Sequence, residues 1–242
     1  MKVAIVGSGY VGLVSGACFA EFGVDVTCVD IDENKIRLLN NGEMPIYEPG
    51  LEHLVSANVR EDRLRFSCSL ESAIGEADLV FIAVGTPSRR GDGHADLSYV
   101  YQAAKDLAPL LSGYTVIVDK STVPVGTARN VKHLILENNK SADFDIASNP
   151  EFLREGDAIT DFMNPDRIIL GHDNPKTLDM LKQLFKPWDC DKIAVNTRTA
   201  EMIKYANNSL LATQISAVNE LANIAAGIEG IDILDVMNAV YM

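Results

Sequence analysis

The feature that most constrains this chain is a glycine-rich turn near its N-terminus, between a short apolar run and a helical pattern. Residues 2–6 form the apolar run, and the turn reads Gly7-Ser-Gly9-Tyr-Val-Gly12. Gly7 allows a tight turn, Gly9 lets a pyrophosphate approach the backbone, and Gly12 lets the helix pack closely on the strand. The helix N-terminus then presents N–H groups and the positive end of its dipole to the phosphates. The pattern predicts a strand–turn–helix unit that binds a dinucleotide.

A second predicted strand, residues 25–29, follows this helix and ends at Asp30. An acid at this position accepts hydrogen bonds from the adenosine ribose and repels a 2′-phosphate, so it favours NAD over NADP. We expect Gly23 to end the first helix and Asp32 to cap the next one. Lys35 lies in the first turn of that next helix, where spacing alone leaves a cofactor contact and a solvated side chain equally open.

Short apolar segments alternate with longer helical patterns as far as about residue 195, which indicates an α/β fold. The expected strands are residues 2–6, 25–29, 64–67, 79–84, 115–119, 144–147, 167–171 and 193–195. Most are flanked by Gly, Asp or Pro, as is typical of β–α units in a mostly parallel sheet. Residues 1–197 are therefore predicted to form a Rossmann-like, doubly wound domain.

The pattern changes beyond this domain, because residues 199–228 contain no proline and no glycine before Gly227. They predict one helix of about 30 residues, well above the usual length of roughly 11–12. A shorter helix is expected at residues 233–240. We therefore assign residues 198–242 to a long connecting helix and the start of a second, all-helical domain.

Composition excludes several classes of partner. A formal net charge of −13 argues against nucleic acid and against an anionic membrane, because the field of the protein would repel both. No apolar run approaches the roughly 20 residues that span a membrane, and the first is too short for a signal peptide. The four cysteines form no CxxC pair, which indicates reduced thiols in a cytoplasmic protein rather than disulfides or a metal site.

Polar loops follow three of the expected strands. They are Gly85-Thr86-Pro87, Ser121-Thr-Val-Pro-Val-Gly-Thr127 and Ser148-Asn-Pro-Glu-Phe-Leu-Arg-Glu-Gly156. Each loop alone is compatible with an ordinary turn. Ligands of open α/β sheets bind beyond the carboxyl ends of the strands, so together the loops predict one side of a ligand site.

In their order along the chain, these segments resemble the UDP-glucose/GDP-mannose dehydrogenase family. Further matching segments are Glu48-Pro-Gly-Leu51, Pro165-Asp-Arg-Ile-Ile-Leu-Gly171 and Glu201-Met-Ile-Lys-Tyr-Ala-Asn-Asn208. The string NPEFLREG and the EMIKYANN helix are specific, whereas a glycine fingerprint alone is not. The resemblance extends over residues 2–208.

The resemblance implies an NAD-dependent enzyme that oxidises the C6 alcohol of a nucleotide sugar twice, through a cysteine thiohemiacetal and a thioester. UDP-glucose, giving UDP-glucuronate, is the expected substrate, and GDP-mannose is the alternative. A non-catalytic NAD-binding module is the alternative of another class. In the family, the nucleophilic cysteine lies in a glycine-rich segment beyond the long helix. None of the four cysteines here has that context, so we expect catalysis to require a longer protein.

The resemblance also implies roles for individual residues. Glu151 would activate water for thioester hydrolysis, and Thr122 would help to hold that water. Lys204 and Asn208 would stabilise the alkoxide; they share a helix face, although the spacing alone favours a solvent-facing stripe that includes Glu201. With the glycine-rich turn, the residues expected to contact NAD are Gly7, Gly9, Tyr10, Val11, Gly12, Asp30, Lys35, Thr86, Thr122 and Glu155. Those expected to contact the nucleotide sugar are Glu151, Phe152, Leu153, Arg154, Glu155, Lys204 and Asn208.

In the family, the long helix also forms the core of a dimer, so we expect a homodimer. The apolar side chains that suit such an interface are Leu210, Leu211, Ile215, Val218 and Leu221. Packing of these side chains against the sheet domain is the alternative.

Overall fold

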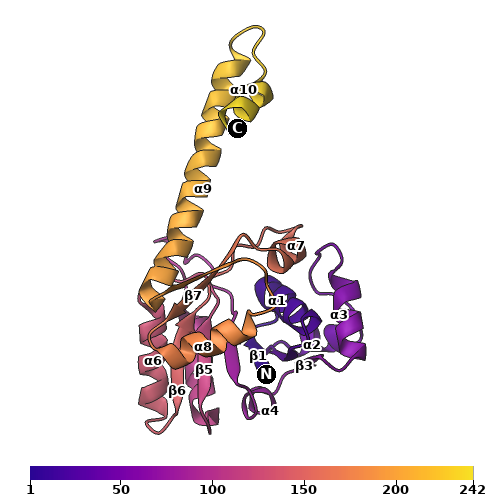
Figure 1. Cartoon of the computed structure of the whole chain (residues 1–242), viewed down its shortest axis with the longest axis vertical. Coiled ribbons are helices and arrows are strands. Elements are labelled where there is room, and N and C mark those ends of the chain that lie inside the picture. Colours follow the sequence, from indigo (N-terminus) through magenta and orange to yellow (C-terminus); the bar gives the residue numbers. More distant parts are fainter. Residues whose placement is uncertain (242) are drawn as a thin grey trace. The chain divides into compact units, whose positions relative to one another are not determined.

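The computed structural model describes residues 1–241, and the chain forms two compact units. The first unit, Met1–Met202, contains a sheet with helices around it (Figure 1). The second unit, Ile203–Met242, contains most of helix α9 (Thr197–Ala226) and the short helix α10 (Ile233–Val240). Among the described residues, no helix is both long and apolar enough to cross a membrane.

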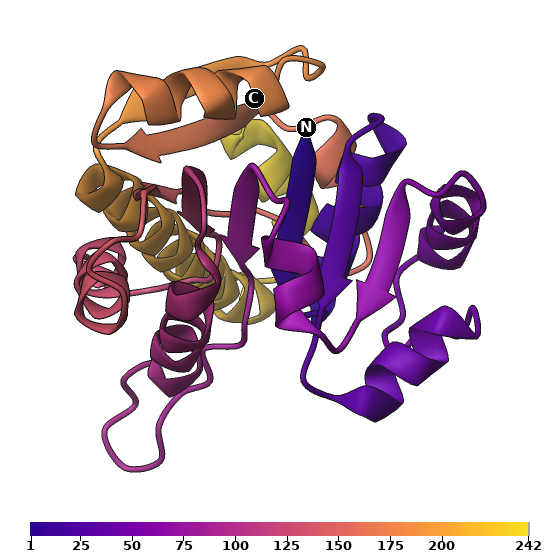
Figure 2. The same cartoon turned by 90° about the horizontal axis from the view of Figure 1, so that it is seen from below.

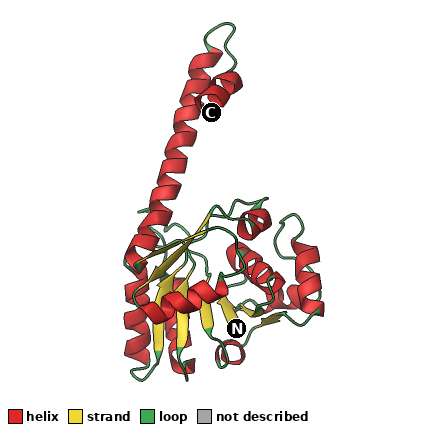
Figure 3. Ribbon diagram, in the orientation of Figure 1, coloured by secondary structure: helices red, strands yellow, loops and turns green. Residues whose placement is uncertain are grey.

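All eight expected strands are present in the first unit (Figure 3). They are β1 (Lys2–Val6), β2 (Asp25–Val29), β3 (Leu64–Ser67), β4 (Leu79–Ile82), β5 (Thr115–Asp119), β6 (Phe144–Ser148), β7 (Arg167–His172) and β8 (Asp191–Val195). The helices between them are α1 (Tyr10–Glu21), α2 (Glu33–Asn40), α3 (Leu51–Arg60), α4 (Leu70–Ile74), α5 (Ser98–Leu107), α6 (Thr127–Asn138), α7 (Ala158–Met163) and α8 (Pro175–Leu184), with a short 3-10 turn at Ala108–Leu110.

The strand order is β3-β2-β1-β4-β5-β6-β7-β8, which confirms the doubly wound prediction. Strands β1 to β6 are parallel, β7 is antiparallel to β6, and β8 is parallel to β7. The chain order reverses beside β1, whose neighbours are β2 and β4, and such a reversal is where ligands bind in open α/β sheets. We call the side of the sheet where β1 to β6 end the carboxyl edge.

Helices cover both faces of the sheet, so the strands are apolar on both sides (Figure 2). Successive side chains of β1 alternate between two cores, as the period of a strand requires. Val3 and Ile5 belong to the core that also contains residues of α1, α3, α7 and α8. Ala4 belongs to the opposite core, with residues of α4, α5 and α6.

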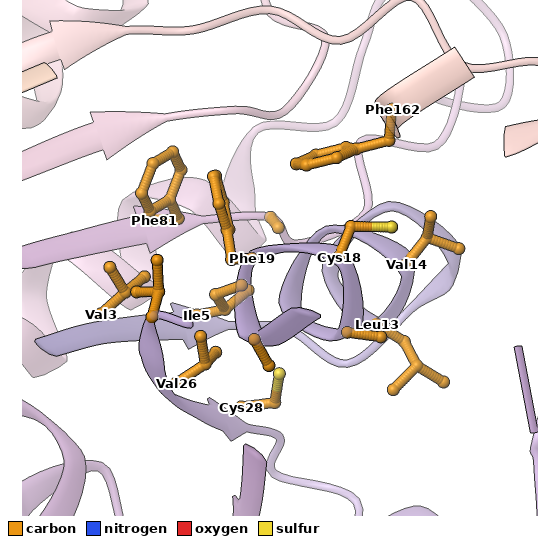
Figure 4. Packing of buried hydrophobic residues seen from close by; sticks show 14 of the residues in the cluster. Val3, Ile5, Leu13, Val14, Cys18, Phe19, Val26, Cys28, Phe81 and Phe162 are labelled. Carbon is orange, nitrogen blue, oxygen red and sulfur yellow. The ribbon is translucent and has the colours of Figure 1, made fainter. Parts of the chain in front are cut away.

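An aromatic cluster fixes α1 on the first of these faces. The ring of Phe19 lies 5.2 Å from Phe81, 5.1 Å from Phe162 and 5.9 Å from Trp188, measured between centroids. The last two pairs are edge-to-face, a favoured arrangement of aromatic rings. Figure 4 shows Phe19 on α1 between Phe81 of the sheet and Phe162 of α7. This cluster positions the helix whose N-terminus follows the glycine-rich turn.

The helix ends are set by local hydrogen bonds. The side chain of Asp32 accepts the N–H groups of Asn34 and Lys35, which confirms the predicted cap of α2. Gly23, in the left-handed region with φ +84°, follows the last residues of α1 as expected. Helix α9 begins two residues earlier than predicted, because the Asn196 side chain accepts the Thr199 N–H at 2.8 Å and so acts as its cap.

The four cysteines are free thiols, as expected. Cys18 and Cys28 are buried in the core, and burial raises the pKa of each thiol to about 12. Cys190 is half-buried, and burial raises its pKa as well. Cys68 is exposed and directly follows β3 at the carboxyl edge.

Candidate functional site

The glycine-rich turn has the geometry that the sequence predicts. Gly7 adopts φ +102°, and its N–H donates to the carbonyl of Val29 at 2.7 Å, which joins the end of β1 to the end of β2. A Cβ on Gly12 would lie 1.8 Å from the Gly7 carbonyl oxygen, so only glycine fits there. A Cβ on Gly9 would have no heavy atom within 4 Å. The backbone at Gly9 is therefore open to an approaching group.

The N-terminus of α1 is suited to an anion. Gly9 is the N-cap residue, and no side chain caps the helix. Its first turn contains no acidic residue to compete for the positive end of the dipole. Ser8 is fully buried, and its hydroxyl has no hydrogen-bond partner in residues 1–241. An open backbone, uncapped N–H groups and an unsatisfied hydroxyl fit the pyrophosphate of a dinucleotide.

Asp30 lies at the end of β2, beside this turn. One carboxylate oxygen accepts the Ser8 N–H at 2.8 Å and the Lys35 ammonium at 2.7 Å, and the other accepts the Asp32 N–H at 3.0 Å. Partial burial opposes ionisation, but Lys35 and the two N–H donors outweigh it and lower the pKa of Asp30. Asp30 is therefore ionised, as a ribose acceptor that excludes a 2′-phosphate must be. Lys35 is ion-paired with Asp30 rather than solvated.

The loops after β4 and β5 lie against each other. The Thr86 hydroxyl donates to the Thr122 carbonyl at 2.9 Å, and the Ser121 hydroxyl donates to the Val84 carbonyl at 2.8 Å. These bonds bring together two predicted cofactor contacts, Thr86 and Thr122, at the carboxyl edge. The remaining predicted contacts are Tyr10 and Val11, which lie on α1, and Glu155, which lies on the loop after β6.

The loop after β6 begins at a buried amide. Asn149 donates to the carbonyl of Ile169 at 2.9 Å and accepts from the ammonium of Lys120 at 3.0 Å, and its own N–H donates to the Asp119 carbonyl. These contacts hold the first residue of the predicted base-containing segment against β5 and β7.

Further along this loop, four of the predicted substrate contacts, Glu151, Phe152, Leu153 and Arg154, already have internal partners. The Glu151 carboxylate accepts the Leu153 N–H at 2.6 Å. Arg167, at the start of β7, stacks on Phe152 with 4.8 Å between guanidinium and ring centre. The Arg154 guanidinium makes two hydrogen bonds to Asp161, at 3.1 and 2.7 Å. The loop is therefore a structured segment.

Glu48 is a buried residue whose role the sequence did not reveal. It is 5% exposed, and its carboxylate accepts hydrogen bonds from the Tyr10 hydroxyl, the Gly156 N–H and the Ala158 N–H. The family resemblance included Glu48 only in a matching segment, Glu48-Pro-Gly-Leu51, and implied no role for it. Its partners are far away in the sequence, so no local sequence pattern predicts them.

The structure places Glu201 differently from the solvent-facing position that helix spacing alone favours. It does not belong to a solvent-facing stripe, because it is 2% exposed. Its carboxylate accepts the N–H groups of Gly126 at 2.5 Å and Ala128 at 2.7 Å. Gly126 is the N-cap of α6 and has no side chain to cap the helix, so Glu201 performs this function from α9. It thereby holds the loop that contains Thr122.

Lys204 and Asn208 lie in the second unit, on the continuous helix α9. Their four-residue spacing places both side chains on one face of the helix, as predicted.

Asp119, at the end of β5, is a buried carboxyl group with an unusual environment. It is 1% exposed, and neither of its oxygens has a hydrogen-bond partner within the described residues 1–241. The nearby Ser121 N–H donates instead to the carbonyl of Ile82. Burial, and then the negative charge of Glu201, raise the pKa of Asp119 well above its usual value. Folding therefore makes this carboxyl group easier to protonate.

We expect Asp119→Asn to raise the melting temperature of the protein at about pH 8, because the pKa of Asp119 is raised in the folded state. Because the folded state binds this proton more tightly than the unfolded state, wild-type stability falls as pH rises above the unfolded pKa of about 3.9. Asparagine does not titrate, so the stability difference between the variant and the wild type should shrink as the pH approaches about 4.

Thermal unfolding of both proteins across this pH range tests the expectation. Asp179→Asn, at an exposed position on α8, is the control and should shift little at any pH. A variant at position 119 that is destabilised equally at all pH values would contradict it.

Comparisons with known proteins agree along the whole chain. Residues 1–189 match the family model described as "UDP-glucose/GDP-mannose dehydrogenase family, NAD binding domain", and residues 198–242 match the central domain of the same family. The chain is 51% identical to UDP-glucose 6-dehydrogenase of Rhizobium meliloti, over 99% of this chain and 56% of the relative. It is 50% identical to UDP-glucose 6-dehydrogenase TuaD of Bacillus subtilis, over 99% and 52%.

Solved structures give the same result. A UDP-glucose dehydrogenase from Pyrobaculum islandicum superposes with a TM-score of 0.94 at 39% identity, over 99% of this chain and 56% of the other. A GDP-mannose dehydrogenase from Pseudomonas aeruginosa superposes with a TM-score of 0.95 at 36% identity, with the same coverage. The chain spans about half the length of the curated relatives it matches.

Proposed function

The chain belongs to the UDP-glucose/GDP-mannose dehydrogenase family, and from this premise we propose that it takes part in the NAD-dependent oxidation of UDP-glucose to UDP-glucuronate. The family acts on nucleotide sugars, and NAD is the cofactor of its N-terminal domain. The observation that carries the choice of UDP-glucose is the high identity, over nearly the whole chain, with bacterial enzymes of that name.

NAD, when bound, supplies the hydride acceptor for oxidation of the sugar alcohol. In the proposed site, the N-terminus of α1 holds the pyrophosphate through backbone N–H groups between Gly9 and Gly12. Asp30 accepts the ribose hydroxyls, and its ionised carboxylate, fixed by Ser8 and Lys35, supports this role. Thr86, Thr122 and Glu155 line the cofactor from the neighbouring loops, together with Tyr10 and Val11 on α1.

We assign Glu151 as the general base that removes a proton from the water that hydrolyses the thioester of the family's reaction. Thr122 helps to hold this water. The two residues follow adjacent strands, since β5 and β6 pair up to Asp119 and Ser148. The hydrogen bond from the Leu153 N–H to Glu151 orients the carboxylate, which a positioned base requires.

Lys204 and Asn208 are proposed to stabilise the negative charge that develops on the sugar oxygen. An ammonium and an amide on one helix face are donors of the type that such a charge requires. Phe152, Leu153 and Arg154 are proposed to border the nucleotide sugar.

We also propose a domain division between residues 197 and 198, which the start of the central-domain match at residue 198 supports.

We propose a homodimer through α9 because the second unit has exposed apolar side chains. Leu210, Leu211, Ile215 and Leu221 are 45–65% exposed, while Val218 is half-buried. Apolar surface of this kind marks an interaction site in many proteins.

The substrate assignment is tested with the protein expressed from its complete gene. We expect UDP-glucose and NAD to yield two NADH per sugar, with little turnover when NADP replaces NAD. GDP-mannose is the second candidate because of the TM-score of 0.95 to a dehydrogenase of that sugar. Faster turnover of GDP-mannose would replace the proposed substrate, and NAD binding without turnover of either sugar would indicate a non-catalytic module.

A further inference from the structure

The carboxylate of Glu48 joins three parts of the first unit that are distant in sequence. Glu48 itself lies between α2 and α3. One of its oxygens accepts from the hydroxyl of Tyr10, the first residue of α1, and from the Gly156 N–H at 2.9 Å. The other oxygen accepts the Ala158 N–H at 2.8 Å. The Gly156 N–H also lies 3.2 Å from the Tyr10 hydroxyl, so this hydroxyl, the Gly156 N–H and one Glu48 oxygen form a closed triangle.

This network is charged and partly buried, since Glu48 and Ala158 are buried, Tyr10 is half-buried and Gly156 is exposed. Burial disfavours ionisation of Glu48, but the hydrogen bonds from Tyr10, Gly156 and Ala158 prevail and lower its pKa. Burial and the bond to Glu48 raise the pKa of Tyr10 to about 12, so its hydroxyl keeps the proton that it donates. Hydrogen bonds to an ionised acceptor are about twice as strong as neutral ones. The contact is therefore a strong connection between its segments.

The segment that Glu48 holds is the far end of the loop that begins at Asn149. Gly156, with φ +94°, closes this loop, and α7 begins two residues later. Asp157 precedes α7 but does not cap it with its side chain, so Glu48 accepts the N–H at the helix start in its place. Because Asn149 fixes the near end through β5 and β7, the residues between have two anchors.

One of these anchors, Glu48, is hydrogen-bonded to α1, the helix whose N-terminus is proposed to bind NAD. Tyr10 is one residue beyond Gly9, where the backbone is open to the pyrophosphate. A ligand that fixes the first turn of α1 also fixes Tyr10, and through Glu48 it fixes Gly156. The loop between the anchors contains Glu151, the proposed base, and Glu155, a proposed cofactor contact.

We propose that Tyr10 and Glu48 are positioning residues that couple NAD binding at α1 to the conformation of the Glu151–Gly156 loop. The consequence for catalysis rests on the proposed role of Glu151, whereas the coupling itself does not. Coupling is reciprocal, so NAD should stabilise the loop, and a stabilised loop should raise the affinity for NAD by the same factor.

Hydrogen exchange in the 242-residue chain tests the coupling at its own atoms. The amides of Gly156 and Ala158 are measured with and without saturating NAD, in the wild type, Tyr10→Phe, Glu48→Gln and the double variant. We expect NAD to slow their exchange about fivefold or more in the wild type and to have little effect in each variant. NAD should still bind all four proteins, about fivefold or more weakly in the variants, and the double variant should resemble the single ones.

Two matched controls distinguish a loss of coupling from a general loss of stability of the protein. Glu52→Gln removes an exposed carboxylate on α3, and Tyr99→Phe removes an exposed hydroxyl on α5; both should keep the wild-type response to NAD. Tyr10→Phe keeps the bonds from Gly156 and Ala158 to Glu48, so it remains informative if Glu48→Gln folds poorly. NAD binding with no protection of the loop in the wild type, or equal protection in Tyr10→Phe, would overturn the coupling alone. A wild-type chain that binds no NAD would overturn the cofactor assignment and the coupling with it.

Discussion

Replacing Gly12 with alanine should destabilise the first unit strongly, whereas the same change at Gly9 should leave the fold intact and remove NAD binding. The Cβ that Gly12→Ala introduces would lie 1.8 Å from the carbonyl oxygen of Gly7 and 3.0 Å from its carbonyl carbon. Both are backbone atoms, so no side chain can rotate to make room. Overpacking costs about 1–3 kcal/mol where neighbours can adjust, and here we expect about 3 kcal/mol or more, or roughly 6–12 °C in melting temperature.

Gly9→Ala is the matched comparison, because both substitutions add one methyl group to the same turn. A methyl group at position 9 meets no atom of the protein, so the melting temperature should change little. It would occupy the space through which the pyrophosphate approaches, and the affinity for NAD should fall about a hundredfold, or roughly 3 kcal/mol. Thermal unfolding and calorimetric titration with NAD measure the two effects. Equal loss of stability in both variants, or full NAD affinity in Gly9→Ala, would contradict this separation of roles.

The second large effect is expected at Glu201. Glu201→Gln keeps the shape of the side chain but removes the charge and one of the two acceptors for the Gly126 and Ala128 N–H groups. Hydrogen bonds to charged groups contribute about 1.5–3 kcal/mol, and a buried donor without a partner is costly. We expect a loss of about 2–4 kcal/mol in unfolding free energy, or roughly 5–15 °C in melting temperature.

Chemical denaturation measures the Glu201 effect, and Glu220→Gln is its control because Glu220 is an exposed glutamate on the same helix. The change should also weaken NAD binding, since the loop that Glu201 holds contains Thr122. A Glu201 variant as stable as the control would show that the two amides find other acceptors.

Local pattern was sufficient for most of the fold. The strands are short apolar runs bounded by turn-forming residues, and burial on both faces makes them continuously apolar, so all eight were found. The differences lie at the ends of elements. Strand β4 stops at Ile82 rather than at residue 84, and α9 starts at Thr197 because Asn196 caps it. Such ends depend on individual hydrogen bonds that periodicity does not encode.

The same distinction applies to the candidate site, where residues with local sequence signals were predictable and residues with distant partners were not. Asp30 was predictable because its role follows from the distance between a glycine turn and the end of the next strand. The contacts of Glu48 and Glu201 were not, because their partners lie 108 and 75 residues away in the chain. Both are glutamates, a residue type that is seldom buried, and sequence alone therefore favours exposure for each. Only the folded chain shows that they accept backbone N–H groups in the interior.

The exposed thiol at the end of β3 gives the molecule a natural site for chemical labelling. Cys68 directly follows Ser67, whose carbonyl accepts the Asp30 N–H at 3.2 Å, so a dye on Cys68 would lie close to the proposed ribose site. Thiolates are the reactive form, and burial raises the pKa of Cys18, Cys28 and Cys190. A maleimide should therefore modify Cys68 first. The protein thus contains, without any substitution, an attachment point for a fluorescent reporter of cofactor occupancy.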